Sequence, residues 1–110
     1  MSHPSKQKGD KAEREAAAIL AEHTGLPIRR KLGAGRTDDE GDIEGLDGWT
    51  IEVKNYRDIA TGVRRGMADC TAEQANAGTT HGVAMVRLPG GRFAMVQTIE
   101  QWAATWRETL

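Results

Sequence analysis

Several kinds of residue on which whole classes of protein depend are scarce in this sequence. Cys70 is its single cysteine, so no disulfide can form within the chain, and a reducing compartment is the simplest setting. The three histidines, His3, His23 and His81, are scattered without metal-ligand spacing, which argues against a cysteine–histidine zinc site. No apolar run approaches membrane-spanning length, and the first ten residues are polar without an apolar signal core. We therefore expect a soluble cytoplasmic protein that does not bind membranes.

The sequence also lacks an excess of charge and the motifs of two large enzyme classes. Its formal net charge is -1, so overall charge carries no nucleic-acid signal. It contains neither a phosphate-binding Walker loop nor the pattern of a Ser/His/Asp triad. The length of 110 residues predicts one domain, residues 1–110, with residues 1–8 as a mobile tail. A core of this size is small enough to benefit from oligomerisation.

Charge is nevertheless uneven along the chain. Basic residues crowd residues 29–36, and acidic residues crowd residues 38–47 directly after them. A clustered acidic group repels itself unless a cation lies nearby. Basic flanks around an acidic centre suit a phosphate held over a metal ion, and they also suit a solvated loop.

The stretch from Gly41 to Lys54 reads as two short strands joined by a turn. Its second strand, Ile51-Glu52-Val53-Lys54, alternates apolar and charged residues, which places Glu52 and Lys54 on one face. Asp42 shares that face if it lies opposite Glu52, a register that also opposes Ile43 to Ile51 and Glu44 to Thr50. This register requires an odd-numbered loop, such as Leu46-Asp47-Gly48 with Gly48 in the left-handed conformation. The alternative is an exposed hairpin whose charges form salt bridges.

The remaining pattern predicts three helices and three further strands. The helices are expected over residues 9–24, 59–77 and from Thr98 onward, and the strands over residues 26–32, 81–88 and 92–97. Gly25 is a natural end for the first helix, and Thr98 with Gln101 forms a capping box for the last. The uninterrupted apolar run 83–86 indicates a strand covered on both faces. The fold class is α/β, in the order α-β-β-β-α-β-β-α.

Helical periodicity predicts which face of each helix is buried. On the first helix the stripe comprises Ala12, Ala16, Ile19, Leu20 and His23. Glu13 lies at the edge of this stripe, where it either reaches inward or is a solvated boundary residue. On the second helix the buried side comprises Ile59, Val63, Met67 and Cys70, while Gly62 and Gly66 predict a break or a late start. On the last helix Ile99, Trp102, Ala103 and Trp106 form an apolar face that is either core or a dimer contact.

Several polar side chains are candidates for contacts with phosphate or with a site. On the second helix and the segment before it, Arg57, Arg64 and Arg65 can bind backbone phosphates or form a solvated face. The glycine-rich loop 33–41 can admit close approach by a phosphate, but it completes no phosphate-binding motif. Gln74 is the one long amide of the second helix that could face a site, and a surface role is the alternative.

Three carboxylates and a lysine together predict a metal-dependent phosphodiester hydrolase. Glu13, Asp42 and Glu52 can surround one or two Mg²⁺ ions, because magnesium prefers carboxylate, water and phosphate oxygens. Such an ion orients the scissile phosphate and lowers the pKa of a bound water. Lys54 then stabilises the developing negative charge as an ammonium group, or it positions or deprotonates the attacking water.

The same residues carry a resemblance to a known family. Asp42 followed by Glu52-Val53-Lys54 resembles the bipartite signature of the PD-(D/E)xK nuclease superfamily, with Gly41 in place of the proline. The stretch Lys8-Gly9 to Glu15 on the first helix resembles the start of archaeal-type Holliday-junction resolvases. The likeness covers roughly residues 8–97. Residues 55–80 and the helix that carries the two tryptophans do not match in detail.

The resemblance implies a restriction-endonuclease-like core with a central mixed five-stranded sheet flanked by helices. It implies Mg²⁺ dependence, with Mn²⁺ as a substitute, and a homodimer that cuts branched DNA. Glu13 would complete the metal site, and Arg14 and either Arg29 or Arg30 would belong to the functional set. Further DNA-binding candidates are the basic residues Lys31, Arg36, Arg57, Arg64 and Arg65. The alternatives are another nuclease of the superfamily, acting on linear or flapped DNA, and a non-catalytic nucleic-acid-binding module.

Overall fold

The computed structural model describes residues 4–31 and 39–110. Its helices are α1 (Pro4–Thr24), α2 (Ile59–Ala77) and α3 (Ile99–Arg107). Its strands are β1 (Arg29–Arg30), β2 (Ile43–Glu44), β3 (Trp49–Lys54), β4 (His81–Leu88) and β5 (Arg92–Val96). This confirms the predicted order α-β-β-β-α-β-β-α. None of the described helices is both long and apolar enough to cross a membrane.

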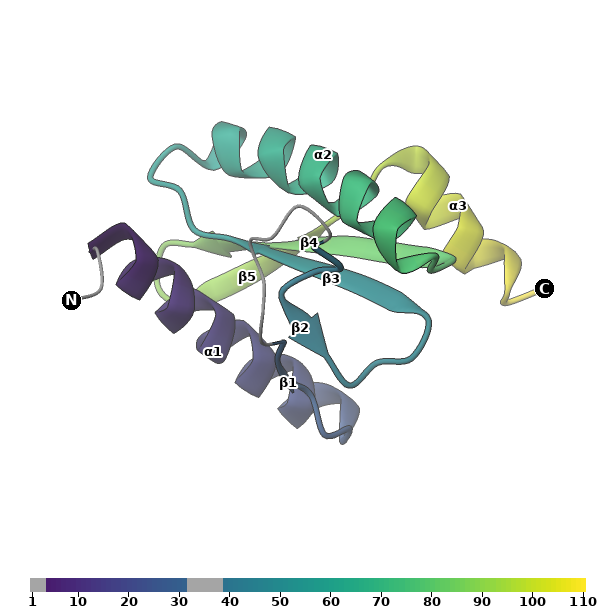
Figure 1. The fold of residues 1–110 in the computed structure, drawn as a ribbon, viewed down its shortest axis with the longest axis horizontal. Helices are drawn as coiled ribbons and strands as arrows, with labels where there is room; N and C mark the ends of the chain where they lie inside the picture. The colour runs from purple at the N-terminus through teal and green to yellow at the C-terminus, as the bar shows by residue number, and fades with distance from the viewer. Residues whose placement is uncertain (1–3, 32–38) are drawn as a thin grey trace.

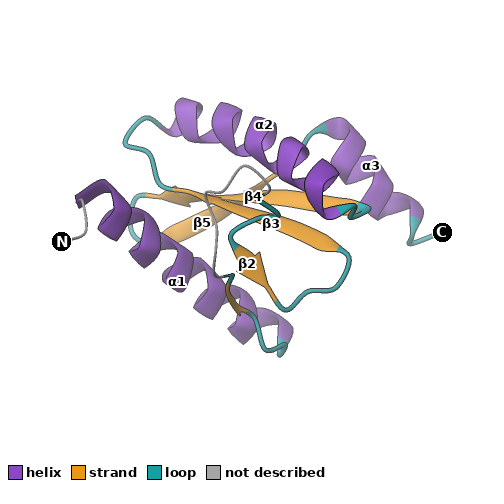
Figure 2. Cartoon of the chain, in the orientation of Figure 1, coloured by secondary structure: helices purple, strands orange, loops and turns teal. Residues whose placement is uncertain are grey.

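The strands form one mixed sheet with helices on both faces. The strand order is β1-β2-β3-β4-β5, in which β3 and β4 are parallel and the other neighbours are antiparallel. A parallel pair needs a long crossover, and α2 supplies it between β3 and β4. Figures 1 and 2 show α1 beneath the sheet and α2 and α3 above it. The predicted five-stranded mixed sheet flanked by helices is therefore confirmed.

The two faces of β3 have different environments, as its alternation predicts. Ile51 and Val53 are buried in the hydrophobic core with Ala12 and Ala16 of α1. Glu52 and Lys54 point to the other face, where Lys54 contacts α2 through Asp69. The strand therefore points its apolar side chains toward α1 and its charged side chains toward α2.

Helix α1 differs from the prediction in its start and in its buried stripe. It begins at Pro4, so residues 4–8 belong to the helix; residues 1–3 lie outside the described chain, and the mobility expected of residues 1–8 stays a prediction. Ala17 is buried, and the stripe is therefore centred between Ala16 and Ala17 at about 100° per residue. This rotation exposes His23, which is not a core residue, and brings Glu13 toward the middle of the stripe.

Helix α2 has its predicted bounds, and Cys70 is buried as predicted, but the rest of its buried face differs. Its buried residues are Gly62, Gly66, Cys70 and Glu73, whereas Ile59 is exposed. The helix runs through both glycines without a break. A Cβ atom at Gly66 would lie 2.9 Å from the Cβ of Ala84 on β4. The glycines therefore allow α2 to approach the sheet closely, and they do not interrupt the helix.

The remaining elements show smaller differences. Strand β1 covers two residues of the predicted 26–32, and Leu32 lies outside the described residues. Strand β5 ends one residue before the predicted Gln97. The capping box of Thr98 and Gln101 is confirmed. Trp102 and Trp106 are 57% and 48% exposed, so they are not core residues.

Candidate functional site

The hairpin between β2 and β3 has the register that the alternating charges predict. Ile43 lies opposite Ile51, and the residues of the odd-numbered loop are Leu46, Asp47 and Gly48. Gly48 has a φ of 82°, the left-handed conformation expected of the third loop residue. The Trp49 N–H donates to the Leu46 carbonyl at 3.2 Å. The predicted odd loop is confirmed.

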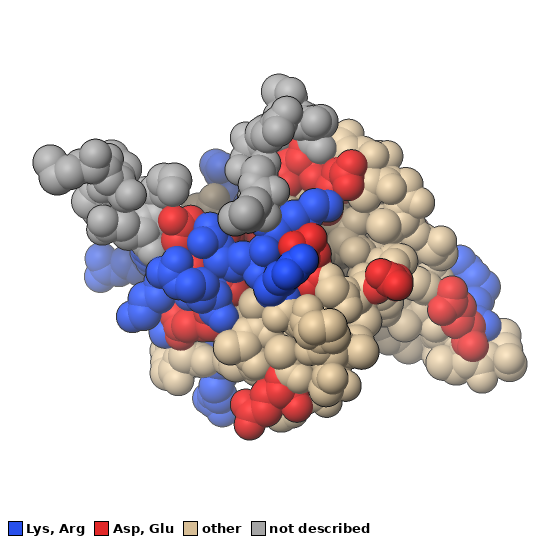
Figure 3. All heavy atoms as spheres, turned by 60° about the horizontal axis from the view of Figure 1, so that its bottom comes forward, with Lys and Arg blue, Asp and Glu red and all other residues tan. Residues whose placement is uncertain are grey.

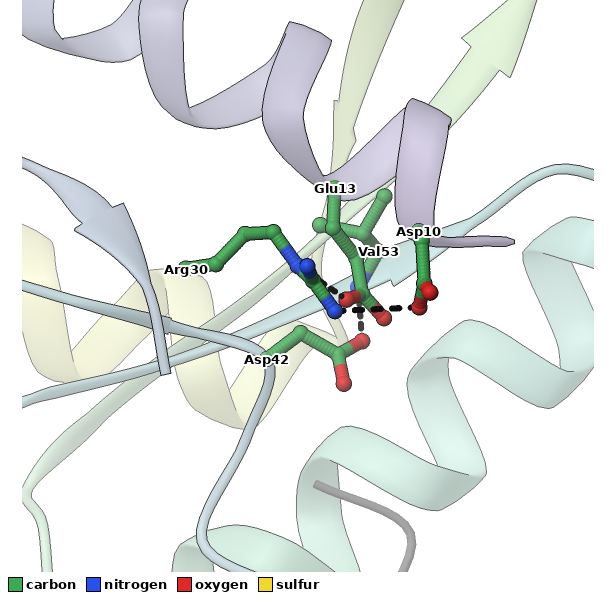
Figure 4. A network of polar contacts seen from close by, with 5 residues as sticks. All are labelled: Asp10, Glu13, Arg30, Asp42 and Val53. Atoms are coloured by element: carbon green, nitrogen blue, oxygen red, sulfur yellow. Dashed lines mark hydrogen bonds and ion pairs between the residues drawn. The ribbon is translucent and has the colours of Figure 1, made fainter. Parts of the chain in front are cut away.

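The ladder of β2 ends at Asp42, where the backbone turns. The Asp42 N–H donates to the Ile51 carbonyl at 2.8 Å, and the Asp42 carbonyl accepts from the Lys31 N–H at 2.8 Å. Gly41 before it has a φ of 114°, which proline cannot adopt because its ring holds φ near -65°. The bend therefore accounts for glycine in this position. It turns the Asp42 carboxylate toward β3, where it accepts from the Val53 N–H at 2.8 Å (Figure 4).

Asp42 and Glu52 form a buried pair of acidic side chains. They are 5% and 3% exposed. Burial, followed by the close carboxyl group of Glu52, raises the pKa of Asp42 to about 9. Burial also raises the pKa of Glu52 to about 8, against the hydrogen bond from Asp42 that lowers it. Like charges in a desolvated site favour one shared proton or a bound cation.

Glu73 of α2 is a third buried acid, and the sequence analysis did not identify it. It is 8% exposed, and its carboxyl group lies next to that of Glu52. Burial raises its pKa to about 7, and the nearby charges of Asp39 and Asp42 contribute. The sequence pattern that could have identified Glu73 is a helical stripe. Gly62, Gly66, Cys70 and Glu73 follow one another at spacings of four, four and three residues.

Glu13 reaches the same region from α1 and is held there by Arg30. The Arg30 Nε donates to Glu13 Oε1, and its Nη2 donates to Asp10 Oδ1, each at 3.0 Å (Figure 4). Burial, with the charge of Asp42, raises the pKa of Glu13 despite this ion pair. Arg29 is exposed and pairs with Glu44 at 2.9 Å. Of the two candidate arginines, Arg30 is therefore the one at the site, and Glu13 reaches inward.

Lys54 is held on the carboxylate side by α2. Its Nζ donates to Asp69 Oδ2 at 2.6 Å and lies 3.9 Å from Glu52 Oε1. Burial lowers the pKa of Lys54, but the hydrogen bond to Asp69 and the charge of Glu52 outweigh it and raise the pKa. Lys54 is therefore an ammonium group at neutral pH, which favours charge stabilisation over the role of a free base.

The acidic side chains meet in pairs. Within the described residues no three histidine, cysteine, aspartate or glutamate side chains converge as a ready metal site. Glu52 Oε2 and Glu73 Oε2 are buried, and neither has a hydrogen-bond partner among the described residues. A hard divalent cation binds such buried carboxyl oxygens in place of the protons that their raised pKa values favour. The donor set therefore fits Mg²⁺ or Mn²⁺, although its side chains must move to share one ion.

The predicted DNA-binding residues form two groups beside this cluster. An open groove between α1 and β1 is lined by Arg14, Arg29 and Arg30 together with Ala17, Ala18, Ile28 and Glu44. Figure 3 shows Lys and Arg side chains gathered in a band on this side of the molecule. Lys31 pairs with Glu40 at 3.2 Å. The second group, at the start of α2 and before it, comprises the exposed residues Arg57, Arg64 and Arg65.

Two candidates from the sequence do not join the cluster. Arg36, with most of the glycine-rich loop, lies outside the described residues. Gln74 donates to the Thr79 carbonyl at 3.1 Å and accepts from Gln101 at 3.2 Å, which ties the end of α2 to α3. The long side chain that faces the carboxylates is that of its neighbour, Glu73. Gln74 therefore has a structural position away from the acidic side chains.

The chain matches no model of a known protein family, no curated protein and no solved structure.

Proposed function

We propose that this chain is a metal-dependent DNA endonuclease with a restriction-endonuclease-like core, and that it is a Holliday-junction resolvase. The observation that carries the proposal is the buried pair Asp42 and Glu52 with the Lys54 ammonium on the same face of β3. Burying two carboxylates beside each other costs several kcal/mol without a compensating cation. Acidic groups whose pKa values are strongly raised by burial are concentrated at functional sites, and this supports a catalytic role for the pair.

The residues of the cluster and of the arginine groove would have separate roles in phosphodiester hydrolysis. Glu13, Asp42 and Glu52 would hold Mg²⁺ or Mn²⁺, which orients a phosphate and makes a bound water more acidic. The Lys54 ammonium, fixed by Asp69, would offset negative charge that develops on the phosphate. Arg30 holds Glu13 in place and also lines the groove with Arg14 and Arg29, which would bind the DNA backbone without reading its sequence.

A junction-cutting enzyme needs two active sites, and we propose that α3 joins two chains. Ile99, Trp102 and Trp106 lie one turn apart along one exposed side of α3. Glu100 and Arg107 lie beside them, seven residues apart, and both are exposed. If two copies of α3 packed antiparallel, Glu100 of each would face Arg107 of the other. This charge pattern is self-complementary, as a two-fold interface requires.

The test is cleavage of four DNA substrates of matched sequence: a four-way junction, a flap, a linear duplex and a single strand. We expect Mg²⁺-dependent, symmetric nicks near the centre of the junction. Cleavage confined to the flap or the linear duplex would replace the resolvase by another nuclease of the same kind. If no substrate were cut with Mg²⁺ or Mn²⁺, the nuclease proposal would be wrong.

A further inference from the structure

Glu73 occupies a position where a charged side chain is costly. The side of α2 that faces the sheet carries Gly62, Gly66 and Cys70, and Glu73 continues this stripe by one turn. At Gly66 the close approach leaves no room for a Cβ atom. A glutamate in so tight an interface loses the water that would solvate its charge. Glu73 therefore needs a compensating partner within the protein or bound to it.

The partner that Glu73 meets is another acid. Its carboxyl group lies against that of Glu52, whose side chain is 3% exposed. Two carboxylates cannot donate a hydrogen bond to each other, and the Oε2 atom of each is buried without a partner among the described residues. The nearest ammonium, that of Lys54, is bound to Asp69 at 2.6 Å and approaches the other oxygen of Glu52 at 3.9 Å. The two Oε2 atoms are therefore buried carboxyl oxygens to which no described residue donates a hydrogen bond.

Asp42 and Glu73 reach Glu52 from different elements of the fold. Asp42 comes from the β2 edge of the sheet and is supported by the Val53 N–H, near Glu13 and Arg30 (Figure 4). Glu73 comes from α2, above the sheet in Figure 1. Glu52 is thus shared between two acidic pairs. Sites that hold two divalent cations use carboxylates in this way, as ligands common to both ions.

We propose that Glu73 and Glu52 form a second divalent-cation position, so that each chain binds two Mg²⁺ or Mn²⁺ ions and Glu52 is a ligand of both. The inference rests on the proposed metal-dependent function and deepens it. It adds Glu73 to Glu13, Asp42 and Glu52, and it assigns α2 a direct part in the site.

The test counts bound ions without reference to DNA. Mn²⁺ is titrated into the protein, and free Mn²⁺ is followed by electron paramagnetic resonance while calorimetry gives the affinities. We expect two ions per chain for the unmodified protein and one for Glu73→Gln. The matched control is Glu22→Gln, which removes the same charge from an exposed position on α1 and should leave two ions.

The count in the unmodified protein keeps the test decisive even if Glu73→Gln does not fold. One ion per chain would mean that Glu73 is protonated and hydrogen-bonded to Glu52, and the proposal would be wrong. Two ions that persist in a folded Glu73→Gln would overturn it as well. DNA cleavage with only one bound ion would reject this inference alone, whereas two bound ions without cleavage of any DNA would reject the proposed function alone.

Discussion

The carboxylate cluster and the outer face of α3 reverse the usual distribution of polar and apolar side chains. Glu52 and Glu73 are 3% and 8% exposed, whereas Ile99 and Trp102 are 82% and 57% exposed. Charged groups are normally solvated and tryptophans are normally covered, because both alternatives are costly in water. The cluster therefore places carboxyl groups where water is excluded, and α3 places large apolar side chains in water.

The two regions are formed by different elements of the fold. The cluster is built from α1, β2, β3 and α2, and the exposed face belongs to α3, which packs against β4. A cation would remove the cost in the first region and a second chain would remove it in the second. Because different elements carry the two features, each can be disrupted while the other is kept.

The largest effect should follow from neutralising the central pair. Asp42→Asn or Glu52→Gln should lower the rate of Mg²⁺-dependent junction cleavage by about 10³-fold or more, because each removes an anionic ligand that supports charge stabilisation. Binding to the junction should persist, since the arginine groove is unchanged. The control is Glu22→Gln, which removes a carboxylate from an exposed position on α1 outside the site and the groove. Cleavage rates and gel-shift affinities are measured for the unmodified protein and each variant. Normal cutting by Asp42→Asn or Glu52→Gln would show that the metal-site assignment is wrong.

Stability should depend on pH in the direction set by the raised carboxyl pKa values. Unfolded carboxyl groups titrate near pH 4, but the pKa values of Glu73, Glu52 and Asp42 are about 7, 8 and 9 in the folded chain. The folded chain therefore holds extra protons, and its stability is lost as pH rises from about 4 through 9. Each extra proton costs about 1.4 kcal/mol per pH unit.

Divalent cations should reverse this loss, because they compete with protons for the same oxygens. Thermal unfolding with and without Mg²⁺ should show a larger rise in Tm at alkaline pH than at acidic pH. Asp42→Asn should flatten the pH profile. A Tm that is insensitive to Mg²⁺ at every pH would contradict the proposed cation site in the carboxylate cluster.

The exposed side of α3 can be tested with the cluster intact. Trp102→Glu should convert a dimer into a monomer, because it places a charge in the apolar contact between the two helices. The matched control is Met95→Glu on β5, which puts the same charge on another exposed apolar residue. Sedimentation velocity gives the oligomeric state. Dissociation by Met95→Glu but not by Trp102→Glu would move the interface to the edge of the sheet.

The smallest effect should come from the close contact that sets Glu73 over Glu52. Gly66→Ala should lower the free energy of unfolding by about 1–2 kcal/mol, since overpacking outweighs the better helix propensity of alanine. Gly9→Ala is the control, because a Cβ atom there meets nothing within 4 Å. It should raise stability by about 0.5–1 kcal/mol. Chemical denaturation measures both, and a stabilising Gly66→Ala would show that α2 can move away from the sheet without loss.

Features that depend on neighbouring residues were predictable from the sequence. The alternation of residues 51–54 and the loop ending at Gly48 determine that Glu52 and Lys54 share a face and that Ile43 meets Ile51, because strand period and turn geometry are local. The capping box at Thr98 is likewise local. The site residues of this hairpin therefore follow from the local sequence pattern.

Only the tertiary structure decided which helix faces are buried and which charges meet. The stripe from Gly62 to Glu73 is buried because α2 lies on β3 and β4 at glycine-limited distance, and apolar periodicity alone favoured Ile59 and Met67. Arg30 rather than Arg29 joins Glu13 because β1 is short and adjoins α1. The two tryptophans remain exposed because α3 packs against β4 through the side that carries the buried Gln101. Which helix faces are buried and which charges meet depend on packing between segments that are far apart in the sequence. The sequence alone does not specify how those segments align.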